Sequence, residues 1–282
     1  DDIVISNKDN GKLETVDGVY GMVKSLAGAR ELTAISVFGD KAASGHVYFE
    51  LTKAADKDVT VTFTVDQAAL DAYNDAHNTS YTMYPNVSLA NGGTATVKSG
   101  EKKSAPVELT IQAGGSIGST YAVAVSATAN DGVEMSAANQ AYIYLVKPQP
   151  AIPDSKKGDI LTHCFVEVNE NILNLGEYTM KKSGKPFFDV VSIFAANINQ
   201  DTETGRVRVF CNDKVSFLLE NADKFIRPLQ AKGIKVVMTI LGNHDEAGMG
   251  NLSEAAAKDF AKELKAYLDI YGLDGIDFDD EF

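Results

Sequence analysis

The fold is decided by a stretch at the carboxyl end of the chain, which reads Leu273-Asp274-Gly275-Ile276-Asp277-Phe278-Asp279-Asp280-Glu281-Phe282. Side chains alternate between the two faces of a β-strand, so Asp277, Asp279 and Glu281 share one face. Carboxylates inside a sheet are costly unless they pair or take part in chemistry. The carboxyl end of a strand is also where the active sites of β/α barrels lie. The stretch therefore predicts a parallel strand with an acidic site at its end.

Three closely spaced acids can also bind a metal ion or form a solvated surface. Neighbours on one strand face lie roughly 6.6 Å apart, where two unit charges repel by about 2.5 kcal/mol at an effective dielectric constant near 20. The row should therefore share protons, as a general acid requires. An EF-hand needs a loop with Gly at its sixth position, whereas Ile276 and Phe278 alternate with these acids. We favour catalysis and predict neither a metal site nor a cofactor.

The sequence before this stretch alternates strands with helices. Apolar runs at residues 160–168, 189–198, 234–241 and 273–282 read as the strands of a β/α alternation, and the continuous apolar residues 190–194 and 236–240 suit a parallel sheet covered by helices. A helix is expected after Ser253, ending at Gly272, and another from Lys214 to Lys232, capped by Asp213 and kinked by Pro228. An open sheet or a barrel would both fit. Four strands supply half of a (β/α)8 TIM barrel.

The first half of the chain has a different period. Short β-rich runs at residues 32–38, 46–53, 59–65, 107–113, 121–129 and 140–146 are typical of an Ig-like β-sandwich, interrupted by one helix that Asp66 caps. Residues 147–154 hold three prolines, which stiffen an extended connector. We therefore predict a sandwich over residues 1–147, a linker over 148–154 and the first half of a barrel over 155–282.

The net charge, the hydropathy and the cysteine count limit which partners and which cell compartments are expected. The net charge of -13 argues against nucleic acid, which is held by clustered Lys and Arg. No apolar run is long enough to cross a bilayer, and Asp1-Asp2-Ile3 does not resemble a signal peptide, so either the protein is cytosolic or a signal was removed. Cys164 and Cys211 are too few for a disulfide framework, so we expect buried free thiols.

The spacing Asp-x-x-Asp-x-Asp-x-Glu, filled by Asp274, Asp277, Asp279 and Glu281, resembles the signature of glycoside hydrolase family 18. Residues 165–169, 193–199 and 240–244 resemble the first three barrel strands of its secreted endo-β-N-acetylglucosaminidases, which act on high-mannose glycans. Most chitinases of the family carry Ser-x-Gly-Gly on the third strand, which is absent here. The resemblance therefore favours cleavage of the chitobiose core of N-glycans; a chitinase and a non-catalytic glycan-binding protein are the alternatives.

The resemblance also implies roles for the acids. Glu281 would be the general acid, Asp279 would orient the 2-acetamido group of the substrate, and Asp277 would support Asp279. The acetamido oxygen would be the nucleophile, so that no second carboxylate is needed and the configuration is retained.

Other polar residues near the expected strand ends are candidate contacts for the glycan. Asn243 and His244 follow the third strand, and His244 is as well suited to a capping role as to substrate contact. Glu167, Asn169 and Asn197 suit sugar hydroxyls, although Asn at a strand end is also common turn chemistry.

Residues 66–85 and 97–101 resemble a β-sandwich domain of surface glycan-handling proteins of gut bacteria. This resemblance implies an exported protein, secreted or at the cell surface with or without a lipid anchor, in which the sandwich is a spacer or a glycan-contacting module. We expect a monomer, and a functional protein that continues well past Phe282.

Overall fold

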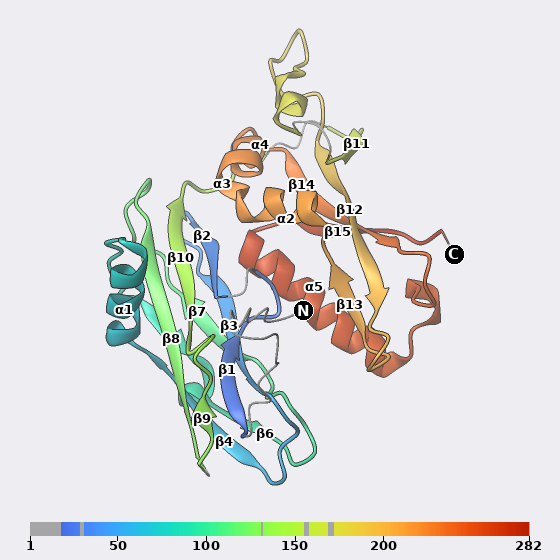
Figure 1. Cartoon of the computed structure of the whole chain (residues 1–282). Helices are drawn as coiled ribbons and strands as arrows, with labels where there is room; N and C mark the ends of the chain where they lie inside the picture. Colours follow the sequence, from blue (N-terminus) through green and yellow to red (C-terminus); the bar gives the residue numbers. More distant parts are fainter. Residues whose placement is uncertain (1–17, 29–30, 131, 155–157, 169–171, 282) are drawn as a thin grey trace, which may run out of the picture.

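The computed structural model describes residues 18–28, 31–130, 132–154, 158–168 and 172–281 (Figure 1). Two of its sheets come from the first half of the chain and one from the second half. The predicted domain boundaries stay a prediction, because one hydrophobic core runs through both halves of the described chain.

Within the described residues, the first half forms two five-stranded sheets. The first sheet has the order β5 (Val87–Leu89), β7 (Val107–Ile111), β3 (Ala43–Leu51), β1 (Tyr20–Lys24), β9 (Glu134–Met135). The second has the order β2 (Leu32–Phe38), β10 (Ala141–Gln149), β8 (Tyr121–Ala129), β4 (Val59–Val65), β6 (Thr94–Val97). Both lie on the left of Figure 1.

The alternating sequence explains these strands. In β4, Val59, Val61 and Phe63 are buried, whereas the threonines between them face solvent. All six predicted strands are present; β1, β5, β6 and β9, of five residues or fewer, were not predicted. A short 3-10 turn, η1 (Ala90–Gly93), joins β5 to β6.

Strand β10 extends two residues into the predicted linker. β10 continues to Gln149, and Pro148 pairs with Val37 of β2. Pro148 is tolerated in the strand because β8, the neighbour on the other side, pairs with β10 only as far as Val146.

One helix covers the outer face of the second sheet. α1 (Gln67–His77) begins as predicted at Asp66, whose carboxylate accepts a hydrogen bond from the Ala69 N–H at 3.2 Å. It ends at Asn78 in the left-handed conformation. Its buried Leu70 packs in a small cluster with residues of β8 and β10.

The second half forms a parallel sheet with the order β11 (His163–Glu167), β12 (Val190–Gln200), β14 (Lys235–Gly242), β15 (Gly275–Asp279). β13 (Val207–Phe210) pairs antiparallel with the end of β12. The four predicted parallel strands are confirmed in type and order. Within the described residues they form an open sheet, so the barrel stays a prediction.

The helix predicted for Lys214 to Lys232 is three short helices, α2 (Asp213–Glu220), α3 (Ala222–Phe225) and α4 (Arg227–Ala231). The breaks fall at Asn221 and Ile226, and Pro228 lies in the first turn of α4, where its missing N–H is not needed. The cap is Asn212, not Asp213: its side chain accepts hydrogen bonds from the N–H groups of Lys214 and Val215. Two 3-10 segments, η2 (Ile172–Glu177) and η3 (Met249–Asn251), lie in the connections.

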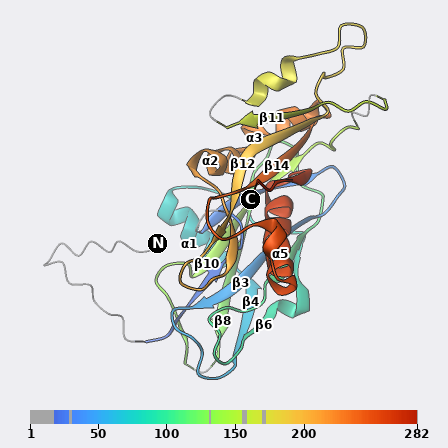
Figure 2. The same ribbon diagram turned by 90° about the vertical axis from the view of Figure 1, so that its right-hand side faces the viewer.

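α5 (Glu254–Tyr271) connects the two halves. As predicted, Ser253 caps its start, and Gly272 ends it with a φ of 63°. α5 packs against β2 and β3 on one side and against β13 and β15 on the other. Figure 1 shows the red helix between the blue strands and the orange sheet, and Figure 2 shows the same helix from the side.

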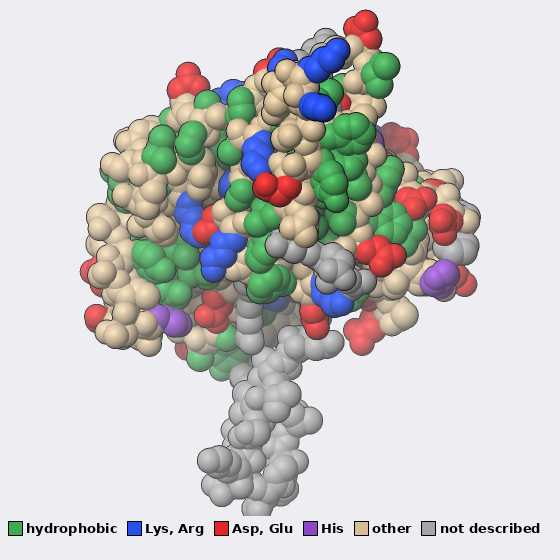
Figure 3. All heavy atoms as spheres, turned by 90° about the horizontal axis from the view of Figure 1, so that it is seen from above, with side chains coloured by type: hydrophobic (Ala, Val, Ile, Leu, Met, Phe, Trp, Pro, Cys, Tyr) green, Lys and Arg blue, Asp and Glu red, His purple; other side chains and the backbone are tan. Residues whose placement is uncertain are grey.

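The surface carries both signs of charge. Seen from above, Lys and Arg are interspersed with Asp and Glu, and hydrophobic side chains lie in patches between them (Figure 3). In the part of the chain that the structure describes, no helix has the length and hydropathy needed to cross a membrane.

Candidate active site

The acid row begins with a carboxylate held by a buried hydroxyl. β14 and β15 pair in parallel, with Thr239 opposite Asp277 and Leu241 opposite Asp279. Thr239 is fully buried, and its Oγ1 donates a hydrogen bond of 2.9 Å to Oδ2 of Asp277. This hydrogen bond fixes the orientation of the Asp277 carboxyl at the base of the row.

Two neighbouring aspartates, Asp274 of the motif and Asp280, have hydrogen-bond partners away from the acid row. Asp280 follows β15, and its Oδ2 accepts a hydrogen bond from the Gly250 N–H at 3.1 Å. Asp274 precedes β15, and its Oδ2 accepts from the Val236 N–H at 2.8 Å and from Nε2 of Gln230 at 3.0 Å. These two residues therefore hold the ends of the strand, while Asp277 and Asp279 are left to line one face.

Glu281 lies just beyond β15 with an exposed side chain. By the alternation of the strand it continues the row of Asp277 and Asp279. An exposed carboxyl at the carboxyl end of a parallel strand is accessible to a substrate.

An irregularity in β12 brings Asn197 to the same face as the acids. The pairing of β12 with β14 shifts between Ile193 and Ala196, so Ser192 lies opposite Val237 while Asn197 lies opposite Leu241. In a regular strand, residues five apart would face opposite sides of the sheet. The bulge reverses the alternation, as bulges commonly do near functional sites.

Cross-strand register now relates Asn197 to the acid row. Asn197 is opposite Leu241, and Leu241 is opposite Asp279. Neighbouring strands are about 4.8 Å apart, so two strand spacings, roughly 10 Å, separate Asn197 from Asp279. The Asn197 amide donates to the carbonyl oxygens of Leu241 and Gly242, at 3.4 and 3.2 Å, which fixes its side chain.

A hollow of about 240 Å³ lies at the carboxyl ends of β11 and β12. Its lining combines the predicted Glu167 and Asn197 with Val168, Phe194, Ala195, Asn212, Lys214 and Leu241. The hollow is smaller than the roughly 300–1,000 Å³ of pockets for drug-sized ligands. Leu241, which lies opposite Asp279, is the part of its lining nearest to the acid row in register.

The remaining predicted contacts lie outside this hollow. Asn243 and His244 follow β14 directly and are exposed, at the same edge of the sheet as Glu281. His244 has a φ of 56°, in the left-handed region. Asn169 falls outside the described residues. The substrate-binding role of each of these residues stays a prediction.

Three residues that contribute to the site were missed. Thr239 was noted only as part of an apolar run, although a hydroxyl inside such a run is itself a signal of a buried partner. Asn212 and Lys214 reach the hollow from the start of α2, a placement that requires the fold.

Among the described residues, no three His, Cys, Asp or Glu side chains are grouped so that they could hold a metal ion. The thiols of Cys164 and Cys211 are unpaired and half-buried, not fully buried as expected. Burial raises the pKa of Cys211 to about 12, which keeps it protonated and unreactive.

Comparison with known proteins identifies the relatives. A protein-family model described as "-like, N-terminal domain" matches residues 21–134. The endo-β-N-acetylglucosaminidase F1 of Elizabethkingia meningoseptica is 50% identical over 133 residues, 47% of this chain and 39% of that protein. The endo-β-N-acetylglucosaminidase of a Flavobacterium species is 45% identical over 136 residues, 48% of this chain and 42% of that protein.

A solved structure, EndoBT-3987 of Bacteroides thetaiotamicron with its Man5GlcNAc product, is 37% identical with a TM-score of 0.44, covering 89% of this chain and 60% of that chain. The chain thus spans about two fifths of the length of the curated relatives it matches. Over about half of its own length, the chain is similar to endo-β-N-acetylglucosaminidases, which confirms the resemblance expected from its acid row.

Proposed function

We propose that the protein is a glycoside hydrolase that cleaves the β-1,4 bond between the two N-acetylglucosamines at the core of N-linked glycans. The observation that carries the proposal is the row Asp277, Asp279 and Glu281 at the carboxyl end of β15, with Asp277 held by Thr239. The identity of 45% and 50% to proteins named endo-β-N-acetylglucosaminidases supports the same reaction.

In the proposed reaction, Glu281 donates a proton to the glycosidic oxygen as the bond to the anomeric carbon breaks. The carbonyl oxygen of the 2-acetamido group attacks that carbon from the other face, giving an oxazolinium intermediate. Asp279 accepts the amide N–H of this group and stabilises the positive charge that develops on it. Glu281 then removes a proton from the water that opens the intermediate, and the configuration is retained.

Asp277 supports this chemistry indirectly. Its hydrogen bond from Thr239 fixes the carboxylate one strand repeat below Asp279. A carboxyl group fixed at that position supports Asp279 from below and keeps it turned towards the substrate.

We propose that glycans of the high-mannose type are the substrates, and that the polar hollow beside the acid row receives one of their rings. Its Glu167, Asn197, Asn212 and Lys214 offer hydroxyl-binding groups without an excess of one charge. Glycoproteins are extracellular substrates, which fits a secreted or cell-surface protein. We further propose that the parallel sheet is half of a β/α barrel, since its strand order β11-β12-β14-β15 follows the chain as barrel strands do.

The test is an assay of the protein at its natural length against three substrates. These are a glycoprotein with high-mannose chains, a glycoprotein with complex chains and a chitin oligosaccharide. Mass spectrometry should find one N-acetylglucosamine left on asparagine in the first case alone. Cleavage of the chitin oligosaccharide with intact glycoproteins would make the protein a chitinase, and binding without cleavage would make it a glycan-binding protein.

A further inference from the structure

A buried arginine joins the two halves of the chain. Arg227 of α4 is 7% exposed, and its Nε donates a hydrogen bond of 3.0 Å to Oγ of Ser36 in β2. The same guanidinium donates to the carbonyl oxygens of Tyr271 at 2.5 Å and Gly272 at 3.3 Å. It also stacks over the Phe38 ring at 4.9 Å. One side chain thus holds a strand of the first half and the end of α5 together.

The contacts of Arg227 continue to the beginning of the acid strand. Nη1 of Arg227 donates to Oε1 of Gln230 at 2.9 Å. Gln230 in turn donates to Gly272 O at 2.8 Å and to Oδ2 of Asp274 at 3.0 Å, and Asp274 accepts the Val236 N–H. An unbroken path of hydrogen bonds therefore runs from Ser36 to the residue that precedes β15.

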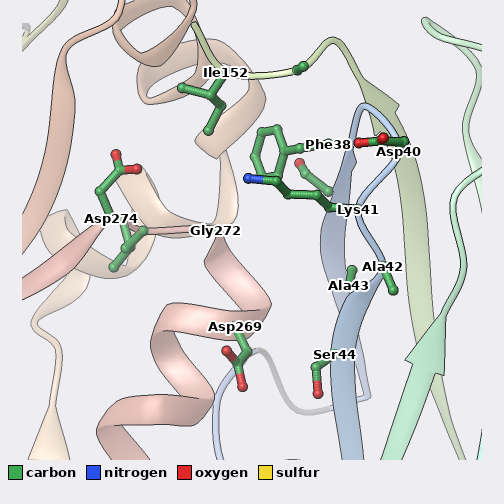
Figure 4. A pocket seen from close by; sticks show the side chains of 13 residues that line it. Phe38, Asp40, Lys41, Ala42, Ala43, Ser44, Ile152, Asp269, Gly272 and Asp274 are labelled. Carbon is green, nitrogen blue, oxygen red and sulfur yellow. The ribbon is translucent and has the colours of Figure 1, made fainter. Parts of the chain in front are cut away.

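The backbone at this junction leaves no room for a side chain at position 272. Gly272 has a φ of 63°, and a Cβ placed there would lie 2.8 Å from Nη2 of Arg227 and 2.9 Å from the Phe38 ring. Figure 4 shows Phe38, Gly272 and Asp274 around one side of a cavity of about 320 Å³ at this junction. The close approach requires glycine and fits the arginine between the two halves.

Charge and apolar contacts reinforce the junction. Nζ of Lys147 in β10 lies 2.8 Å from Oδ2 of Asp223 in α3. Burial lowers the pKa of Arg227 to about 10, so it stays charged near neutral pH, and a buried charge without partners would be costly. α5 packs against β2 and β3, within the core that both halves share.

We propose that Arg227 is a positioning residue, and that the N-terminal sandwich is part of the catalytic unit rather than a spacer. Asp274 precedes Asp277 by three residues, roughly 10 Å along a strand. Hydrogen bonds through Gln230 and Arg227 connect the start of β15 to Ser36. They therefore fix the position of Asp277 and Asp279 along the strand direction of the sheet. The coupling between the sandwich and β15 does not depend on the proposed function. The expected effect of this coupling on catalysis rests on the proposed function.

The test removes the hydroxyl that links the arginine to the sandwich. Ser36→Ala takes away the acceptor of Arg227 Nε, and Ser126→Ala is the matched control. Ser126 lies in the same sheet, and its hydroxyl also bonds one charged side chain, Asp66, at 2.7 Å, but far from the junction. Both variants lose one bond to a charged partner, so their global effects should be similar.

Hydrogen–deuterium exchange then measures the coupling between the sandwich and β15 directly. Loss of one bond to a charged group should speed exchange at residues 273–277 about tenfold in Ser36→Ala, with no change there in Ser126→Ala. Scanning calorimetry of the wild-type chain should show one unfolding transition for both halves. At natural length, Ser36→Ala should lower kcat on a high-mannose glycoprotein and leave KM unchanged.

Equal exchange at residues 273–277 in the two variants, or two separate unfolding transitions, would overturn the proposal. Exchange and calorimetry need no substrate. Coupling without glycan cleavage by the wild type would therefore overturn the proposed function and leave the junction proposal standing.

Discussion

The buried Glu263 should make stability depend on pH, with a sign that the structure defines. Glu263 in α5 is 6% exposed; its Oε1 accepts the Val209 N–H at 3.2 Å, and its Oε2 lies 3.4 Å from Nη2 of Arg206. Burial raises the pKa of Glu263 to about 7, although Arg206 opposes the rise. The folded chain therefore binds this proton more tightly than the unfolded chain, whose glutamates have a pKa near 4.5.

The stabilisation from this proton is present below pH 4.5 and is lost as the pH rises through 7. The difference in pKa of about 2.5 corresponds to about 3.4 kcal/mol at most, because each pKa unit is worth 1.36 kcal/mol. Glu263→Gln keeps an oxygen for Val209 and cannot ionise, but it turns an amide towards Arg206. We expect it to be about 2 kcal/mol more stable than the wild type at pH 8 and equal to it at pH 4.5.

Urea denaturation at both pH values measures this difference. Glu254→Gln is the control, since Glu254 lies on the same helix with an 83% exposed side chain. It should follow the wild type at both pH values. If Glu263→Gln also ran parallel to the wild type from pH 4.5 to 8, the burial argument would be wrong.

Three further predictions concern other buried groups. Thr239→Val removes the donor to Asp277 and should lower kcat about tenfold with little change in KM; an unchanged kcat would contradict the role of Asp277. Burial lowers the pKa of His46 to about 4, and its Nε2 accepts the Leu26 N–H at 2.8 Å, so the contribution of His46 to stability should fall by about 3 kcal/mol as the pH drops from 6.5 to 4, against the opposite contribution of Glu263. His46→Gln should abolish that loss in denaturation curves, and a loss of the same size in the variant would assign it elsewhere. Gly272→Ala should cost about 2 kcal/mol from its left-handed backbone and the clash with Arg227, and an unchanged melting temperature would contradict the tight junction.

Much of the fold could be predicted from local sequence patterns. The alternation in β4, the Asp66 cap and the Ser253-to-Gly272 helix are each written in a few neighbouring residues, and each was predicted correctly. The break at Asn221 was missed because the apolar spacing on either side of it is continuous with one helix. Where the signal is short-range, the sequence is sufficient.

The site depended on features that no local pattern encodes. The bulge after Ile193 places Asn197 on the same face of the sheet as the acids, whereas a strict period of two would have put it on the face that the helices cover. The motif residue Asp274 holds the start of the strand rather than joining the acid row. Its partners Gln230 and Val236 are far away in sequence, so no local pattern indicates this role. The junction through Arg227 likewise joins residues 191 positions apart.

The most direct test of the central claim compares two neighbouring acids, Glu281 of the motif and Asp280 beside it, at the natural length of the protein. Glu281→Gln removes the proposed proton donor, whereas Asp280→Asn retains an oxygen for the Gly250 N–H on the opposite side. Release of glycan from a high-mannose glycoprotein, read by mass spectrometry, should fall at least ~1,000-fold in Glu281→Gln and stay within about threefold of wild type in Asp280→Asn. Full activity in Glu281→Gln, or equal losses in both variants, would contradict the assignment of the chemistry to one face of β15.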